Sequence, residues 1–90
     1  MHTVYILRSL RDDSLYVGTT ERTAEERLRE HNAAKTEGIR NRLPYTIVRV
    51  EHYEHFEIAL ARERFFKTGK GRKVLKSLLS DESIAGKTER

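Results

Sequence analysis

The sequence predicts a single α+β domain in which a strand hairpin is followed by a helix, a third strand and two further helices. The hairpin is indicated by β-branched, aromatic and apolar residues at 4–7 and 15–17, joined by a polar turn at residues 11–14. Apolar residues at helical spacing indicate the helices. The chain has 90 residues, which leaves room for one hydrophobic core.

The first helix is predicted from a capping box formed by Thr23 and Glu26, and should reach about residues 32–35. Arg27 and His31 are four residues apart, so they share the thin apolar side of this helix. A polar pair on the apolar side is a local conflict, and such conflicts mark functional sites. The alternative is that both side chains are solvated on a loosely packed helix.

The third strand is predicted at residues 45–50, after Pro44, and should continue toward Tyr53. His52 and His55 lie near its end. No third metal ligand is close to them in the sequence, so we interpret both as surface histidines.

The second helix is predicted at residues 57–68. Glu63 falls in the middle of its apolar side, where a carboxylate is costly unless it is paired, hydrogen-bonded or bound to a metal. Two interpretations stay open from the periodicity alone. Glu63 is either a metal ligand or the structural partner of one of three cations, Arg27, Arg62 or Lys67.

The third helix is predicted at residues 72–79, after Gly69 and Gly71, which we expect to break the preceding helix. Residues 80–90 are polar, and we expect them to form a frayed, flexible tail. The predicted domain therefore covers residues 1–79.

Basic residues gather around the entry of the third helix and in the loop at residues 35–43. A charge run of this kind is either a solvated face or a surface that grips phosphates. The predicted nucleic-acid-binding residues are Lys35, Arg40, Arg42, Lys67, Lys70, Arg72, Lys73 and Lys76.

The chain carries 18 basic and 14 acidic residues, and its net charge of +4 favours an anionic partner only weakly. It has no cysteine, which excludes disulfides and thiolate metal sites. It also lacks an apolar run of about 20 residues and a signal-peptide pattern. We therefore expect a soluble, cytoplasmic protein.

Five residues supply the functions that phosphodiester cleavage needs. These functions are a base for water, a cation for the charge on the pentavalent phosphorus, and a carboxylate for a hard metal ion. A tyrosine base needs a neighbour that lowers its pKa from about 10. The candidate residues are Tyr5, Tyr16, Arg27, His31 and Glu63.

The chain resembles the GIY-YIG nuclease superfamily in the order and spacing of its motifs. The resemblance covers nearly all of residues 3–79 and is greatest to small, stand-alone members of the superfamily. It implies a three-stranded antiparallel sheet flanked by three helices. The motifs are Val4-Tyr5-Ile6, Tyr16-Val17-Gly18, Arg27-x3-His31 and Arg62-Glu63, with the basic segment at residues 67–72.

The resemblance also implies a role for each candidate residue. Tyr5 takes the proton of the attacking water, with help from His31, and Tyr16 positions the water or the phosphate. Arg27 stabilises the charge of the transition state. Glu63 binds one divalent metal ion, Mg²⁺ or Mn²⁺.

Three positions depart from the family pattern. The first motif reads Thr3-Val4-Tyr5 instead of Gly-Ile-Tyr, which keeps the tyrosine. Thr19 stands where some relatives carry a lysine, and no asparagine follows Glu63.

The function that follows is a metal-dependent DNA endonuclease acting in DNA repair, recombination or processing. Its substrate would be DNA, whether branched, flapped or single-stranded, and RNA stays open. We expect structure-selective or weakly sequence-specific cleavage, or dependence on a partner protein or on homodimerisation, because a bare 90-residue domain carries no appended base-reading element. The alternatives are a nucleic-acid-binding module without catalysis, and an adaptor whose basic face meets an acidic protein.

Overall fold

The computed structural model describes residues 1–33 and 42–88, with side chains as far as residue 80. The elements follow one another in the order that the sequence predicts. They are β1 (His2–Ser9), β2 (Leu15–Thr20), α1 (Ala24–Asn32), β3 (Tyr45–Tyr53), α2 (Phe56–Phe66) and α3 (Gly69–Thr88).

The strands of the described residues form one antiparallel sheet, as predicted, and their order in it is β2-β1-β3. β1 is the central strand, and β2 forms an open edge. In the register of β1 and β2, Tyr5 lies opposite Gly18, and Leu7 lies opposite Tyr16. The two tyrosines of the hairpin are therefore brought onto the same face of the sheet.

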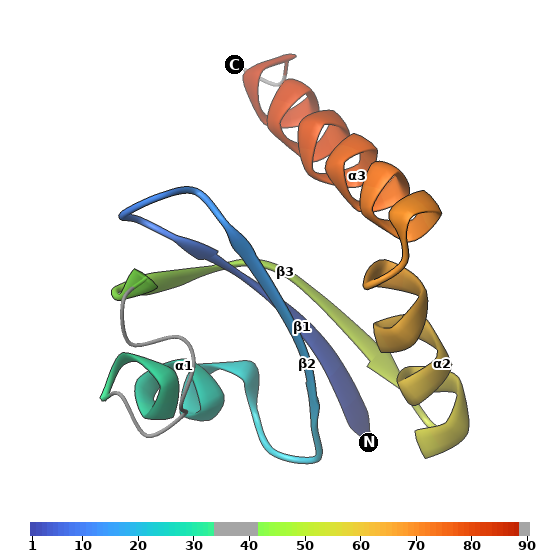
Figure 1. Ribbon diagram of the computed structural model, residues 1–90. Coiled ribbons are helices and arrows are strands. Elements are labelled where there is room, and N and C mark those ends of the chain that lie inside the picture. The colour runs from blue at the N-terminus through green and yellow to red at the C-terminus, as the bar shows by residue number, and fades with distance from the viewer. Residues whose placement is uncertain (34–41, 89–90) are drawn as a thin grey trace.

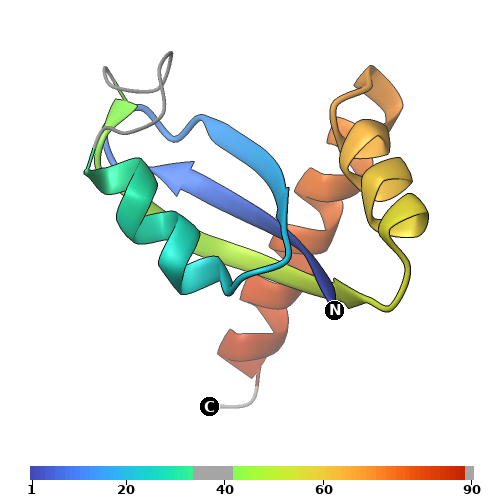
Figure 2. The same ribbon diagram turned by 90° about the horizontal axis from the view of Figure 1, so that it is seen from below.

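Helices cover both faces of the sheet, with α1 on one side and α2 on the other (Figure 1, Figure 2). Successive side chains of β1 alternate between these faces. Tyr5 and Leu7 belong to the core beneath α1, whereas Val4 and Ile6 belong to the core beneath α2 and α3. The small domain thus has two thin cores that share the central strand.

The boundaries of α1 confirm the predicted capping box, because the hydroxyl of Thr23 accepts a hydrogen bond from the backbone N–H of Glu26 (3.1 Å). On α2, Ala59 and Phe66 are buried, whereas Phe56 is 48% exposed and packs its ring against that of His2.

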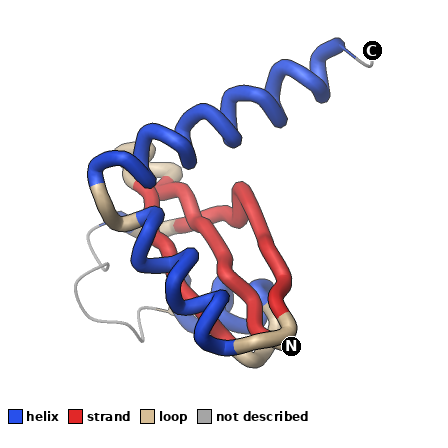
Figure 3. The backbone as a smooth tube through the Cα atoms, turned by 90° about the vertical axis from the view of Figure 1, so that its right-hand side faces the viewer, coloured by secondary structure: helices blue, strands red, loops and turns tan. Residues whose placement is uncertain are grey.

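The predicted start of the third helix at Arg72 and its end at Leu79 are both wrong, since α3 runs from Gly69 to Thr88 (Figure 3). The break between α2 and α3 is at residues 67–68. Thr68 caps α3, because its hydroxyl accepts from the backbone N–H of Gly71 at 3.0 Å. Residues 80–88 contain no proline, so nothing ends the helix at Leu79.

Gly71 does not break a helix but lets two helices approach closely. A Cβ atom at this position would lie 1.7 Å from the backbone oxygen of Phe65, at the end of α2. Gly71 therefore permits the close packing of the start of α3 against the end of α2. None of the helices in the described part of the chain combines the length and apolarity that a membrane span requires.

Candidate active site

Tyr5 lies at the centre of the candidate site. Tyr5 comes from the central strand and is only 1% exposed. Its side chain extends over Gly18 of the neighbouring strand β2. A Cβ atom at Gly18 would lie 2.4 Å from the Tyr5 hydroxyl oxygen. Gly18 is therefore required by close approach, because any larger residue would displace the hydroxyl group.

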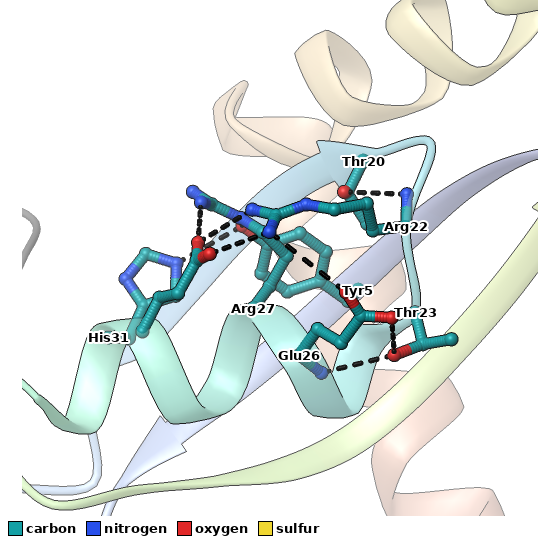
Figure 4. A network of polar contacts seen from close by, with 8 residues as sticks. Tyr5, Thr20, Arg22, Thr23, Glu26, Arg27 and His31 are labelled. Atoms are coloured by element: carbon teal, nitrogen blue, oxygen red, sulfur yellow. Dashed lines mark hydrogen bonds and ion pairs between the residues drawn. The ribbon is translucent and has the colours of Figure 1, made fainter.

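Two side chains of α1 hold the Tyr5 hydroxyl, as Figure 4 shows. Arg27 donates its Nε–H to the hydroxyl oxygen at 3.2 Å, and His31 Nε2 lies 3.1 Å from the same oxygen. An arginine only donates, so the Tyr5 oxygen accepts from Arg27 and its own hydrogen can point to His31. The shared face that the sequence predicts for Arg27 and His31 is therefore confirmed, and it faces Tyr5.

Glu30 fixes the guanidinium of Arg27 through an ion pair, and it also pairs with Arg22 at 2.7 Å. Hydrogen bonds from Arg22 and Arg27 lower the pKa of Glu30 to about 2. Glu30 is not among the candidate residues that the sequence predicts. Its spacing of three residues after Arg27 was the available signal.

Tyr16 closes the site on the β2 side. Its ring centroid lies 4.7 Å from that of His31 and 6.3 Å from that of Tyr5. The side chain is only half-buried, so the ring separates the buried Tyr5 and His31 from solvent. Both tyrosines and the two candidate residues of α1, Arg27 and His31, are thus brought together.

Burial is the main factor that sets the protonation states of Tyr5 and His31. Burial raises the pKa of Tyr5 above its ordinary value, and the hydrogen bond from Arg27 only partly opposes this effect. Burial, with the nearby charge of Arg27, lowers the pKa of His31. Near pH 7 the phenol is therefore protonated and the imidazole is neutral, so His31 has a lone pair that can receive the Tyr5 proton.

Glu63 approaches the site from α2, across the sheet edge. Thr19 donates its hydroxyl hydrogen to Glu63 Oε1 at 2.5 Å, and Lys67 Nζ donates to Oε2 at 2.9 Å. Burial raises the pKa of Glu63, but the bonds from Lys67 and Thr19 outweigh it and lower the pKa overall. Thr19 follows Gly18 directly in β2, so its side chain points to the opposite face of the sheet from the Tyr5 side chain. The charge of Glu63 contributes to the raised pKa of Tyr5.

The structure also identifies the cation that pairs with Glu63. Of the three alternatives named above, the partner is Lys67. Arg27 is engaged by Tyr5 and Glu30, and Arg62 pairs with Glu51 on β3.

A cleft of about 640 Å³ runs along the open edge of β2 toward the junction of α2 and α3. Tyr16 lines it, and so do four of the predicted nucleic-acid-binding residues, namely Arg42, Lys67, Arg72 and Lys76. Lys70 and Lys73 are exposed but do not line this cleft. Lys35 and Arg40 lie outside the described residues.

The carboxylate of Glu63 provides oxygen donors of the kind that a hard metal ion prefers. Among the described residues, no group of three or more His, Cys, Asp or Glu side chains could form a metal cage. Mg²⁺ and Mn²⁺ do not require such a cage, because water and phosphate oxygens can complete their coordination. The ammonium group of Lys67 already occupies a cation position at Glu63 Oε2. The pairing with Lys67 is the structural alternative named above, and the role of Glu63 as a metal ligand stays a prediction.

The fold and the family comparison assign the chain to a nuclease superfamily. The family model of the GIY-YIG catalytic domain matches residues 1–76, and the chain belongs to this family. Nucleases of this family are generally dependent on a divalent metal ion.

Among solved structures, the chain is similar to the UPF0213 protein BH0048 from Bacillus halodurans, determined in solution by NMR. The two share 30% sequence identity over 86% of this chain and 83% of that chain, with a TM-score of 0.52. No curated protein matches the chain. The family match and the fold confirm the resemblance drawn from the motifs.

Proposed function

We propose that the protein is a metal-dependent DNA endonuclease that hydrolyses phosphodiester bonds at the site around Tyr5. The observation that carries this proposal is the position of the Tyr5 hydroxyl. It is hydrogen-bonded to both Arg27 and His31, lies against Gly18 and is within electrostatic reach of Glu63. Tyr5, Arg27 and His31 are thus in direct contact, and the charge of Glu63 acts on the Tyr5 hydroxyl, which supports the proposal.

In the proposed reaction, the attacking water gives a proton to the Tyr5 oxygen while the Tyr5 proton moves to His31 Nε2. The water oxygen forms a bond to phosphorus, and the bond from phosphorus to the leaving oxygen breaks. This coupled transfer avoids a free phenolate, which the raised pKa of Tyr5 makes costly.

Two further residues act on the phosphate in this proposal. Arg27, held in place by Glu30, stabilises the negative charge that develops on the phosphoryl oxygens. Tyr16 positions the water or the phosphate. Glu63 would hold Mg²⁺ or Mn²⁺, and the ion would supply Lewis-acid stabilisation of the same charge.

The cleft beside Tyr16 supports a nucleic-acid substrate, because its cations can neutralise phosphates. We propose DNA as the substrate, whether branched, flapped or single-stranded. Action in repair, recombination or processing, a cytoplasmic location, and specificity from a partner or a second copy remain predictions.

The test is cleavage of plasmid, branched, flapped and single-stranded DNA in the presence of Mg²⁺ or Mn²⁺, and in EDTA. We expect metal-dependent cleavage that Glu63→Ala abolishes. The matched control is Glu57→Ala, which removes an exposed carboxylate from the same helix. Cleavage that is unchanged in Glu63→Ala would show that the assigned site is wrong.

A nucleic-acid-binding module without catalysis is the second candidate, and the raised pKa of Tyr5 favours it, because a protonated phenol is a poor base. This candidate predicts salt-dependent DNA binding through the cleft. It would be supported if DNA binds but is not cleaved with any metal ion, and if Glu63→Ala leaves the affinity unchanged.

A further inference from the structure

Lys67 contacts both Glu63 and the cationic cleft. Its ammonium group donates to Glu63 Oε2 at 2.9 Å, and its side chain also lines the cationic cleft beside Tyr16. Glu63 itself does not line this cleft. Lys67 is therefore the residue that links the metal-ligand position to the proposed path of the nucleic acid.

The two partners of Glu63 differ in how easily they can leave. Thr19 is held in the backbone ladder of β2, and its hydroxyl is at 2.5 Å from Oε1. Lys67 has a flexible four-carbon stem, and its side chain is 52% exposed, against 18% for that of Glu63. Exposed ion pairs four residues apart on a helix are weak. A cation that competes for Glu63 would therefore displace Lys67 and leave Thr19 in place.

The other cations of the cleft differ from Lys67 in this respect. Arg42 lies 3.8 Å from Asp12, far from Glu63 in the sequence. Arg72 and Lys76 form no ion pair with a carboxylate among the described residues. Lys67 alone among these four is neutralised by the carboxylate assigned to the metal.

We propose that Lys67 exchanges between Glu63 and a nucleic-acid phosphate in the cleft, so that metal binding and nucleic-acid binding are coupled. This inference rests on the proposed function of the same site. Without metal, Lys67 covers Glu63 and its charge is withheld from the cleft. When a divalent cation takes Glu63, Lys67 is released to a phosphate. Because coupling is reciprocal, a bound nucleic acid also raises the affinity of Glu63 for the cation.

The experiment is a double-mutant cycle on the full chain, measured in EDTA so that no metal and no cleavage are involved. The probe is a fluorescein-labelled, single-stranded DNA of twelve nucleotides, and its affinity is measured by fluorescence anisotropy over a range of salt concentrations. The proteins are the wild type, Glu63→Gln, Lys67→Gln and the double variant. Thermal unfolding verifies that each variant is folded, and Lys67→Met serves as a second variant.

Glu63→Gln releases Lys67, so we expect the affinity for the DNA to rise about two- to fivefold, which corresponds to the free energy of an exposed ion pair. The slope of log affinity against log salt should become steeper by about 0.7, as expected for one more phosphate contact on a single strand. In the Lys67→Gln background, Glu63→Gln should change neither quantity. In the Lys70→Gln background it should keep its full effect, because Lys70 carries the same charge but does not line the cleft.

Equal effects of Glu63→Gln in the wild-type and Lys67→Gln backgrounds would overturn the inference. A second arm uses Mn²⁺ alone, titrated into the chain by calorimetry. We expect Lys67→Gln to bind Mn²⁺ about two- to fivefold more tightly, and Lys70→Gln to match the wild type. Unchanged Mn²⁺ affinity in Lys67→Gln would also overturn the inference.

These outcomes separate the inference from the proposed function. The effects of Glu63→Gln and Lys67→Gln on DNA affinity could be additive while metal-dependent cleavage still requires Tyr5 and Glu63. That result would contradict the coupling and leave the proposed function standing. If none of the variants binds the oligonucleotide, both the coupling and the nucleic-acid substrate are contradicted.

Discussion

At the scale of a single residue, the Tyr5 hydroxyl lies between a permanent cation, Arg27, and a neutral acceptor, His31. Burial disfavours the charged forms of both phenol and imidazole, which explains the raised pKa of Tyr5 and the lowered pKa of His31. His31 Nδ1 has no hydrogen-bond partner among the described residues. The neutral imidazole is thus ready to receive a proton at Nε2 but is poorly stabilised once charged.

The titration of His31 tests this account of the pair. We expect the ring signals of His31 to titrate with a midpoint below 6.5, because burial and the charge of Arg27 disfavour the imidazolium ion. Arg27→Gln should move the midpoint upward by removing one of these causes. The measurement is an NMR titration of the histidine ring protons. A wild-type midpoint at or above 6.5 would contradict the assigned electrostatics.

The sequence was informative about these residues to different degrees. Tyr5, Arg27 and His31 were predictable because motif order and helical spacing place them together. Glu30 was not singled out, because its role depends on the direction of the Arg27 side chain, which spacing alone does not fix. The pairing of Glu63 with Lys67 was one of three open alternatives, and only the three-dimensional structure selects it.

At the scale of the elements, α2 carries Glu63 and must be fixed against the sheet. Arg62 does this by donating to Glu51 on β3, with Nε at 2.9 Å from Oε1, while its guanidinium lies 4.2 Å from the ring centroid of Phe66. Burial raises the pKa of Glu51, but hydrogen bonds from Arg62, Tyr53 and Arg49 outweigh it and lower the pKa to about 2. No sequence pattern predicted this link between β3 and α2.

The stabilising effect of Glu51 should depend on pH in a defined direction. Its folded pKa is lowered from 4.5 to about 2, so the stabilisation is present above pH 4.5 and is lost as the pH falls toward 2. We expect Glu51→Gln to lower the free energy of unfolding by about 1–3 kcal/mol at pH 7, and by progressively less below pH 4.5. Urea unfolding at several pH values measures this. A difference that does not vary with pH would contradict the prediction, and Glu57→Gln is the exposed control.

The junction of α2 and α3 gives a second prediction at this scale. Gly71→Ala should destabilise the fold by more than about 2 kcal/mol, because its Cβ would overlap the backbone oxygen of Phe65. Gly69→Ala should be neutral or stabilising by up to about 1 kcal/mol, because nothing lies within 4 Å of its Cβ. Thermal unfolding of the two variants checks both expectations. Equal stability would contradict the close approach of the helices.

At the scale of the whole molecule, Tyr5 lies on the face of the sheet that α1 covers, whereas Glu63 of α2 reaches Thr19 of β2 on the other face. The order of the elements and the three-stranded sheet were predictable, because hairpin, capping and periodicity signals agree with one another. The extent of α3 was not, since the glycines were interpreted as helix breakers and the cap at Thr68 was missed. The cleft joins Arg42 to residues of α3 that are distant in sequence, so it emerges only from the folded chain.

The central claim is that the Tyr5 hydroxyl moves the proton in a phosphodiester hydrolysis. The most direct test is the single-turnover cleavage rate of a flapped DNA with Mg²⁺ or Mn²⁺, for the wild type and Tyr5→Phe. Tyr45→Phe, which alters another buried tyrosine of the same core, is the control. We predict that Tyr5→Phe folds but cleaves about 10²- to 10⁴-fold more slowly, whereas Tyr45→Phe retains the wild-type rate. Cleavage by Tyr5→Phe at the wild-type rate would contradict the claim.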